Sequence, residues 1–109
     1  MANFSDFEQL DIRTGTIIDV QEFPEAKNPA WKLEIDFGDL GIKKSSAQIT
    51  KLYSKGELLG KQIIAIVNFP ARKIVSFSSE VLVLGVYGNG KEVILLHPER
   101  NVANGSKIG

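Results

Sequence analysis

Residues 31–37, WKLEIDF, alternate strictly between apolar and polar side chains. The apolar positions are Trp31, Leu33, Ile35 and Phe37, and the residues between them are charged. Because successive side chains of a strand point to opposite faces of a sheet, this pattern predicts a half-buried β-strand. We therefore expect Trp31 in the core or at its edge. The alternative is that its ring is an exposed platform for a ligand.

Other segments rich in apolar and β-branched residues predict further strands. They are DIRTGTIIDVQEF (11–23), GIKKSSAQ (41–48), KQIIAIVNF (61–69), VLVLGV (81–86) and EVILLH (92–97). The last two flank YGNGK, whose Asn89-Gly90 pair is a strong signal of a hairpin turn. Ser5-x-x-Glu8 and Ser54-x-x-Glu57 fit the capping box, which predicts two short helices, and Gly60 should end the second.

The order of these elements is helix, three strands, helix, strand and hairpin, which is the order of the OB-fold. We expect an all-β protein: an OB-fold barrel with a five-stranded core, short helices and a C-terminal β-hairpin extension. Residues 1–109 should form a single domain. OB-folds bind ligands across strands two and three and at two loops, which correspond here to residues 23–30 and 70–79.

The third predicted strand runs into KKSSAQIT (43–50), in which small hydrogen-bonding residues follow two lysines. Alternation divides this segment between two faces of the sheet. Because Ile49 should point into the core, we expect Ala47 to pack inward beside it. The opposite face should meet the ligand, and it carries Lys44, Ser46, Gln48 and Thr50.

Basic residues concentrate in the middle of the chain, although the net charge of the whole is zero. Residues 42–74 carry seven basic groups and one acidic group, a net charge of +6, whereas residues 1–41 carry −6. Such a block favours binding of a polyanion or an acidic partner, or it is a solvated basic face. Arg72 and Lys73 are adjacent, so at most one of them should face a given ligand.

The remaining candidate binding residues lie in or near the loop at 70–79. Phe77 is either a lid on the core or an exposed aromatic contact. Asn68 is a polar residue within an apolar run, so it either has a buried partner or lines the ligand groove. The full set of predicted ligand-binding residues is Lys44, Ser46, Gln48, Thr50, Asn68, Arg72, Lys73, Phe77 and Ser79.

The sequence offers little to catalysis or metal binding. His97 is the only histidine and there is no cysteine. No glycine-rich phosphate loop and no spacing of His, Asp and Glu suits a phosphate or a metal. We therefore expect neither an enzyme nor a cofactor. The acidic N-terminus is unlike a signal peptide, and every apolar run is short, so we expect a cytoplasmic protein without membrane insertion.

The chain resembles the CsaA family, small export-related chaperones that are close relatives of the tRNA-binding domain appended to some aminoacyl-tRNA synthetases. The matching segments are LDIRTGTI (10–17), IDFGDLGIKKSSAQIT (35–50), LLGKQIIAIVNFPARKI (58–74), SEVLVLG (79–85) and VILLHPERNVANGSKIG (93–109). The resemblance implies an OB-fold homodimer that binds unfolded or precursor polypeptides. The tRNA-binding relatives usually have a serine-glycine-leucine turn in place of Ser46-Ala47-Gln48, whereas the basic loop at Arg72 is kept.

Three functions remain as hypotheses. The first is a dimeric chaperone for unfolded or precursor polypeptides, linked to protein export. The second is a structure-specific tRNA-binding protein, and the third is an adaptor that binds a folded protein. The first two differ in salt dependence, since binding through several phosphates weakens steeply with salt and binding in an apolar groove does not. Both the odd and the even positions of VLVLGV are apolar, so both faces of this strand need to be covered. A small domain has one barrel interior, and a second copy of the chain would cover the other face, which favours a homodimer.

Overall fold

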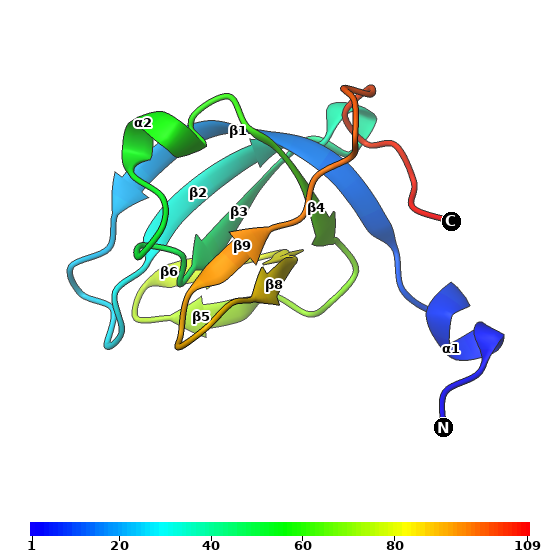
Figure 1. Cartoon of the computed structure of the whole chain (residues 1–109), viewed down its shortest axis with the longest axis horizontal. Coiled ribbons are helices and arrows are strands. Elements are labelled where there is room, and N and C mark those ends of the chain that lie inside the picture. Colours follow the sequence, from blue (N-terminus) through cyan, green and yellow to red (C-terminus); the bar gives the residue numbers. More distant parts are fainter.

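Five strands form one curled sheet at the centre of the molecule (Figure 1). The computed structural model describes residues 1–109. The sheet has the order β3-β2-β1-β4-β7, and all its neighbouring strands are antiparallel. Its members are β1 (Ile12–Glu22), β2 (Trp31–Asp36), β3 (Ile42–Ala47), β4 (Gln62–Ile66) and β7 (Leu82–Val83). The predicted OB-fold barrel with a five-stranded core is confirmed.

The length of β1 allows the barrel to curl, because its two halves pair with different strands. Residues 12–16 pair with β4 and residues 16–22 pair with β2. The register shifts between Ile17 and Asp19. A shift of this kind bends a strand and increases its twist, so the sheet can close on itself.

The inside of the barrel is filled by apolar side chains from alternate strand positions. Leu33, Ile35 and Phe37 are at most 1% exposed, as the alternation in residues 31–37 predicted. Trp31 packs against the edge of this core, and its Nε1 donates a hydrogen bond to the carbonyl oxygen of Tyr53 at 3.0 Å. The prediction that Trp31 lies at the core edge is thus confirmed.

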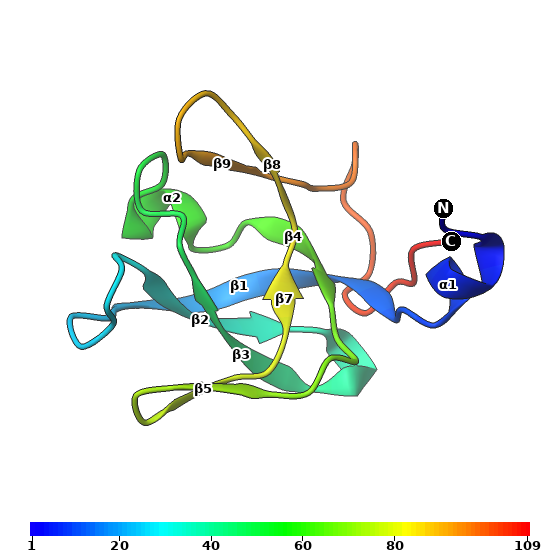
Figure 2. The ribbon, with the colours of Figure 1, turned by 90° about the horizontal axis from the view of Figure 1, so that it is seen from below.

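Two hairpins lie on either side of β7 (Figure 2). The first consists of β5 (Arg72–Ile74) and β6 (Phe77–Ser79), within the segment that the sequence predicted to be a loop. The second consists of β8 (Gly85–Tyr87) and β9 (Val93–Leu95), which is the predicted C-terminal hairpin.

The prediction of one continuous strand over 81–86 is wrong. The barrel strand ends at Val83, and the chain passes into the second hairpin at Leu84. The N–H of Leu84 donates to the carbonyl of Ile64 in the barrel, while its own carbonyl accepts from the N–H of Leu96 beside the hairpin. Apolar residues of both parities are present because this segment serves two sheets in turn.

The helices are short, and none is long and apolar enough to span a membrane. They are α1 (Phe4–Glu8) and α2 (Lys55–Leu58), with a 3-10 turn, η1, at Gly38–Leu40. The predicted capping box of α2 is confirmed, since Ser54 Oγ accepts from the N–H of Glu57 and Glu57 Oε1 accepts from the N–H of Ser54. As predicted, Gly60 follows its end, with a φ of 88°.

The predicted capping box of α1, built on Ser5 and Glu8, is wrong. The N-cap is Asn3, whose side chain accepts from the N–H of Asp6 at 3.2 Å, and Asp6 accepts from the N–H of Asn3 at 3.0 Å. The two boxes overlap in sequence, and asparagine is as good an N-cap as serine. Ser5 Oγ donates to Asn3 Oδ1, which favours the earlier start.

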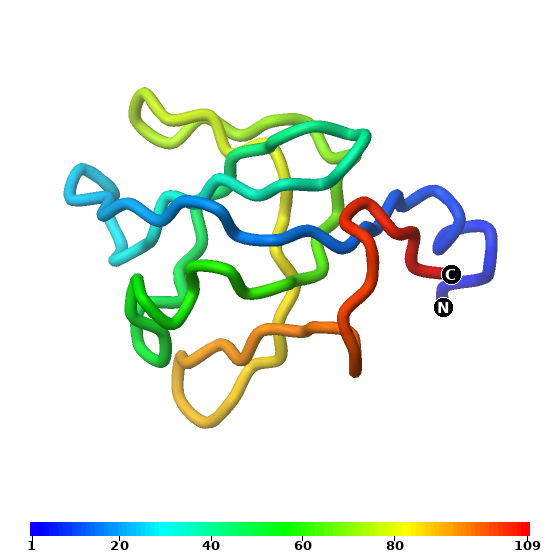
Figure 3. The backbone as a smooth tube through the Cα atoms, turned by 90° about the horizontal axis from the view of Figure 1, so that it is seen from above, coloured from blue at the N-terminus to red at the C-terminus, as the bar shows by residue number.

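The C-terminal segment returns to β1 and ends near the start of this strand (Figure 3). The N–H of Thr14 donates to the carbonyl of Ser106 at 3.0 Å, and the N–H of Ile108 donates to the carbonyl of Ile12 at 2.9 Å. These bonds cover the edge of β1 that faces away from β4. We refer to the contact of residues 102–106 with Thr14, Thr16 and Gln62 as the C-terminal seam.

Candidate ligand-binding groove

Three adjoining hollows meet over β3, and Ser46 and Arg72 line all three. The largest has a volume of about 610 Å³ and lies between β3, β7 and the second hairpin. The second adjoins the β1–β2 loop at Lys27, and the third adjoins Phe69. We refer to the three together as the β3 groove. It lies in the region where OB-folds bind their ligands.

The residues of β3 and those just after it are divided between two faces, and the division agrees with the predicted one. The buried positions are Ser45, Ala47 and Ile49. The outer positions are Lys44 and Gln48, which are exposed, and Ser46, which is half-buried. The outer face thus brings Ser46 and Gln48 to the groove.

The buried hydroxyl of Ser45 has a structural role. Its Oγ donates to the carbonyl of Val81 at 2.9 Å. One residue earlier, the N–H of Lys44 donates to Glu80 Oε1, and its carbonyl accepts from the N–H of Glu80. These bonds close the barrel between β3 and the chain before β7. The Ser45 hydroxyl is buried, and this bond gives it the partner within the protein that a buried polar group requires.

Beyond this closure the edge of β3 has free hydrogen-bonding groups. The backbone N–H and carbonyl of Lys44 both bond to Glu80. Because these groups alternate in direction along a strand, the backbone N–H and carbonyl groups of the even-numbered residues of β3 point away from β2. The N–H of Ser46 donates to Ser79 Oγ at 3.0 Å. The carbonyl of Ser46 and both the N–H and the carbonyl of Gln48 have no partner in the protein. We refer to these three groups as the open edge of β3.

The opposite wall of the groove is apolar and was missed from the sequence. It is formed by Leu82, Val83, Leu84, Tyr87 and Val93. Tyr87 is 85% exposed, although it is a large aromatic residue. Its position next to the Asn89-Gly90 turn is visible in the sequence, but its place on the groove depends on the break at Leu84, which alternation alone does not reveal.

Phe77 and Lys44 lie outside the β3 groove, on a separate hollow of about 160 Å³ that Lys32 also lines. The Phe77 ring packs edge to face against Phe23, with 5.5 Å between the ring centres. Lys32 Nζ lies 5.9 Å from the centre of the same ring. This favours the interpretation of Phe77 as a lid on the end of the barrel.

Asn68 connects two chain segments. Its Oδ1 accepts from the N–H of Asp11 at 2.8 Å, and its Nδ2 donates to the carbonyl of Gln9 at 2.9 Å. The amide therefore fixes the chain between α1 and β1. Thr50 is half-buried and lines none of the three hollows of the groove.

The basic residues of segment 42–74, which we call the basic block, lie in different parts of the structure. Arg72 lines the groove, whereas the adjacent Lys73 lines none of its hollows. Lys55 lies in α2, which is separated from the β5–β6 hairpin by β2 and β3 (Figure 1). Lys61 Nζ lies 5.7 Å from the centre of the Tyr53 ring. Of the nine predicted ligand-binding residues, the groove brings together Ser46, Gln48, Arg72 and Ser79.

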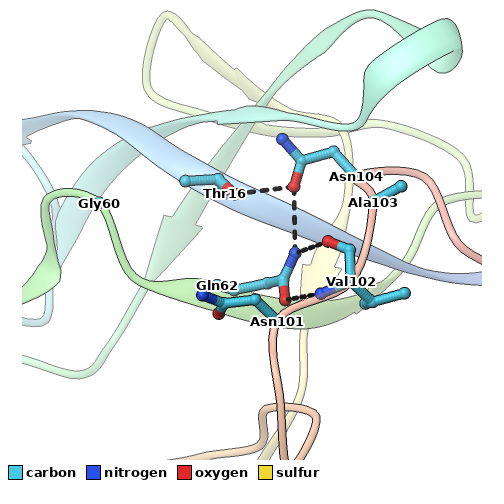
Figure 4. Close-up of a pocket in the computed structure, with 7 residues that line it drawn as sticks. All are labelled: Thr16, Gly60, Gln62, Asn101, Val102, Ala103 and Asn104. Atoms are coloured by element: carbon cyan, nitrogen blue, oxygen red, sulfur yellow. Dashed lines mark hydrogen bonds between the residues drawn. The ribbon is translucent and has the colours of Figure 1, made fainter.

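A second polar hollow, of about 390 Å³, lies at the C-terminal seam (Figure 4). Here the side chains bind one another and the backbone of Val102. Gln62 Nε2 donates to the carbonyl of Val102 at 2.7 Å, Gln62 Oε1 accepts from the N–H of Val102, and Thr16 Oγ1 donates to Asn104 Oδ1 at 2.7 Å. The polar groups of this hollow hold the C-terminal segment in place, so we do not assign it a ligand. No group of three or more His, Cys, Asp or Glu side chains is placed to hold a metal ion.

Residues 12–107 match the family model described as "Putative tRNA binding domain". The chain is 36% identical to the methionine--tRNA ligase of Nanoarchaeum equitans over 99% of its own length, and 33% identical to that of Thermococcus onnurineus over 96%. It spans only 14% of the length of each of these curated relatives.

Solved structures similar to this chain include two chaperones of its own length. It is 54% identical to the chaperone CsaA of Bacillus anthracis, with a TM-score of 0.95, and the match covers 100% of this chain and 99% of the other. It is 52% identical to the CsaA chaperone protein of Picrophilus torridus, with a TM-score of 0.94 and full coverage of both chains. A MetRS related protein from Pyrococcus horikoshii, 20% identical with a TM-score of 0.88, shares the fold. The chain therefore belongs to the family of tRNA-binding domains and, within it, to the CsaA proteins.

Proposed function

We propose that the protein is a chaperone that binds unfolded or precursor polypeptides in the β3 groove. The observation that carries this proposal is the mixed lining of the largest hollow. Small polar residues, Ser46 and Gln48, lie opposite the apolar Leu82, Val83 and Tyr87. An unfolded polypeptide presents amides and apolar side chains together, so it can satisfy both walls. The full-length similarity to two CsaA chaperones supports the proposal. The role is one of binding and requires no catalytic group.

We also infer that the protein acts as a cytoplasmic homodimer linked to protein export. Apolar side chains remain uncovered in two places. No residue of α1 is buried, and Phe4 is 71% exposed. Val86 and Ile94, paired across the second hairpin, are 52% and 47% exposed. A second copy that covers these side chains would supply the burial that a small domain lacks. Light scattering should give the mass of two chains, and a mass of 12.0 kDa at micromolar concentration would refute the dimer.

Binding of tRNA is the second candidate function. It is favoured by the match of residues 12–107 to a tRNA-binding family and by the cation Arg72 in the OB-fold binding region. The division of the basic block weakens it, because Arg72 alone of the seven basic residues in 42–74 lines the groove.

A competition titration distinguishes the two functions. A fluorescently labelled, permanently unfolded client is titrated with the protein at low and at high salt, and tRNA is then added as competitor. We expect client affinity to change little with salt, whereas tRNA affinity should fall steeply, since each phosphate contact adds about one unit to the logarithmic salt slope. Tight tRNA binding together with no measurable client binding would overturn the chaperone proposal.

Arg72→Gln and Lys73→Gln form a matched pair for the same titration, because the two residues are neighbours and lose the same charge. We expect Arg72→Gln to weaken tRNA binding and to lower its salt slope by about one unit, if one phosphate contact is lost. Lys73→Gln should have a smaller effect, since Lys73 does not line the groove. Equal effects of the two substitutions would show that tRNA does not bind preferentially at the side chain that lines the groove.

A further inference from the structure

The open edge of β3 lies within the β3 groove, where a client would be bound. We propose that the client binds as an added β-strand, with its backbone hydrogen-bonded to the carbonyl of Ser46 and to the N–H and carbonyl of Gln48. This inference rests on the proposed chaperone function and specifies how the client is held. Its basis is the hydrogen-bonding capacity of β3 and the shape and charge of the groove.

The free groups have the spacing of a strand ladder. Ser46 lies in β3, and Gln48 is the first residue after β3. The alternation of buried and accessible residues continues through residues 45–49, which indicates that the chain stays extended through Gln48. Backbone groups two residues apart on an extended chain face one neighbouring strand. Unpaired edges of this kind pair readily with another extended chain. The neighbouring position is closed, since the backbone of Lys44 is already bonded to Glu80. A client can therefore pair with β3 only from Ser46 onward.

The facing barrel strand has an unpaired position as well. The N–H of Leu84 donates to the carbonyl of Ile64 in β4. The backbone groups of the odd-numbered residues beside it therefore point away from β4. Val83 is such a residue, so its N–H and carbonyl face away from β4, the one strand with which β7 pairs. Val83 and Gln48 both line the largest hollow. Unpaired backbone thus borders this hollow on two sides, which suits an extended segment laid between them.

The lining of the hollow also indicates the chemistry of the segment. An added strand points alternate side chains to opposite sides, and one set would contact the apolar wall at Leu82 and Tyr87. The charged residues of the largest hollow are Arg72 and Lys91, and no carboxylate lines it. Charge complementarity therefore favours a segment with apolar residues at alternate positions and neutral or acidic residues between them.

A set of backbone-methylated peptides tests the proposal. The probe is a capped, fluorescent octapeptide with valine at alternate positions and threonine and glutamate between them. Each amide nitrogen is methylated in turn, which removes one backbone donor and leaves the side chains unchanged. We expect the affinity to fall by between about threefold and tenfold at two positions, two residues apart, whose amides donate to the carbonyls of Ser46 and Gln48; this is the range that the loss of one net hydrogen bond implies. The other positions should bind nearly as well as the unmodified peptide.

The other outcomes separate this inference from the proposed function. If the unmodified peptide binds and no single methylation matters, or if all of them matter equally, the client is not held as a strand, although the chaperone function stands. If the peptide does not bind while an unfolded protein does, the strand-addition proposal also fails. If neither binds and tRNA does, the proposed function itself fails.

Two substitutions at Gln48 test the backbone hydrogen bonding of the protein rather than that of the peptide. Gln48→Pro removes the N–H of the open edge, whereas Gln48→Ala removes the side chain and keeps the N–H. Because this N–H has no partner in the unliganded protein, Gln48→Pro should remain folded. We expect Gln48→Pro to weaken peptide binding more than Gln48→Ala does, and equal losses would overturn the inference. If Gln48→Pro does not fold, the methylated peptides decide alone.

Discussion

The C-terminal seam and the β3 groove both contain polar groups, but they differ in whether those groups already have hydrogen-bond partners within the protein. At the seam, Thr14 Oγ1 donates to the carbonyl of Ala103 at 3.0 Å, and Thr16, Gln62 and Asn104 bond to one another. In the groove, the carbonyl of Ser46 and the backbone N–H and carbonyl of Gln48 have no partner. Polarity alone therefore does not identify a binding site. Hydrogen-bonding capacity that the fold leaves unused does.

The two regions also differ in accessibility. Thr14 is 2% exposed, and the segment 103–106 lies directly on it. Gln48 is exposed and its neighbour Ser46 is half-buried. A change at the seam should thus act on stability, and a change in the groove should act on binding.

The largest effect should come from Gly105→Ala at the seam. Gly105 has a φ of 85°, and a Cβ atom there would lie 2.4 Å from the carbonyl oxygen of Phe37, so backbone would have to move. We expect the free energy of unfolding to fall by about 3 kcal/mol or more, from the steric conflict added to the backbone strain. Thermal and denaturant unfolding measure this change.

Gly60→Ala is the matched control for Gly105→Ala. Gly60 has a φ of 88°, but a Cβ atom there would meet nothing within 4 Å. Only the left-handed backbone is penalised, at about 1–2 kcal/mol. An equal loss of stability in the two variants would mean that Gly105 is not in close contact with the backbone of Phe37, and that the C-terminal segment does not pack at the seam as described.

The next effect should come from phenylalanine on the two faces near the end of β3. Ala47 is 8% exposed and packs in the core, so Ala47→Phe should overpack the barrel at a cost of roughly 1–3 kcal/mol. Ser46 lines all three hollows, so Ser46→Phe should fill the groove and abolish client binding while shifting stability by less than about 0.5 kcal/mol.

Melting temperature and client affinity are measured together for these two variants. Unfolding caused by Ser46→Phe, with a stable but inactive Ala47→Phe, would reverse the assignment of the faces. If neither substitution affects client binding, the groove is not the client site, and the contrast with the seam loses its functional meaning.

The smallest effect concerns α2, which lies outside both regions. Hydrogen bonds from the backbone N–H and the side chain of Ser54 hold the pKa of Glu57 below its ordinary value. Because the pKa is lower in the folded state, the ionised carboxylate stabilises the protein above the ordinary pKa, and this contribution disappears as the pH falls through the lowered value. We expect Glu57→Gln to melt slightly below the parent protein at neutral pH.

The difference between Glu57→Gln and the parent should shrink to nothing in acid, as the parent carboxylate becomes protonated. Melting curves recorded over this pH range check the prediction, with client affinity as the control that should not change. A difference that persists at the lowest pH would show that the stabilisation does not come from the charge of Glu57.

The barrel could be predicted largely from the sequence, because its signals are local. The alternation of residues 31–37 determined which side chains of β2 are buried, and the same period placed Ala47 inward and Ser46 outward. The capping box at Ser54 specifies its own backbone geometry within four residues. Asn89-Gly90 correctly located the turn between β8 and β9. The α1 start was mispredicted because two capping patterns overlap and local rules rank them equally.

The tertiary structure alone decided which polar groups remain unused. Ser45 and Ser46 are adjacent and chemically identical, yet the hydroxyl of Ser45 reaches Val81, 36 residues away, while Ser46 lies on the groove. The amide of Asn68 is occupied by Gln9 and Asp11, 59 and 57 residues away. Arg72 lines the groove and Lys73 does not, because the segment predicted as a loop forms a strand. Alternation determines the face on which a side chain lies, but hydrogen-bond partners distant in sequence determine whether its groups are free to bind a ligand.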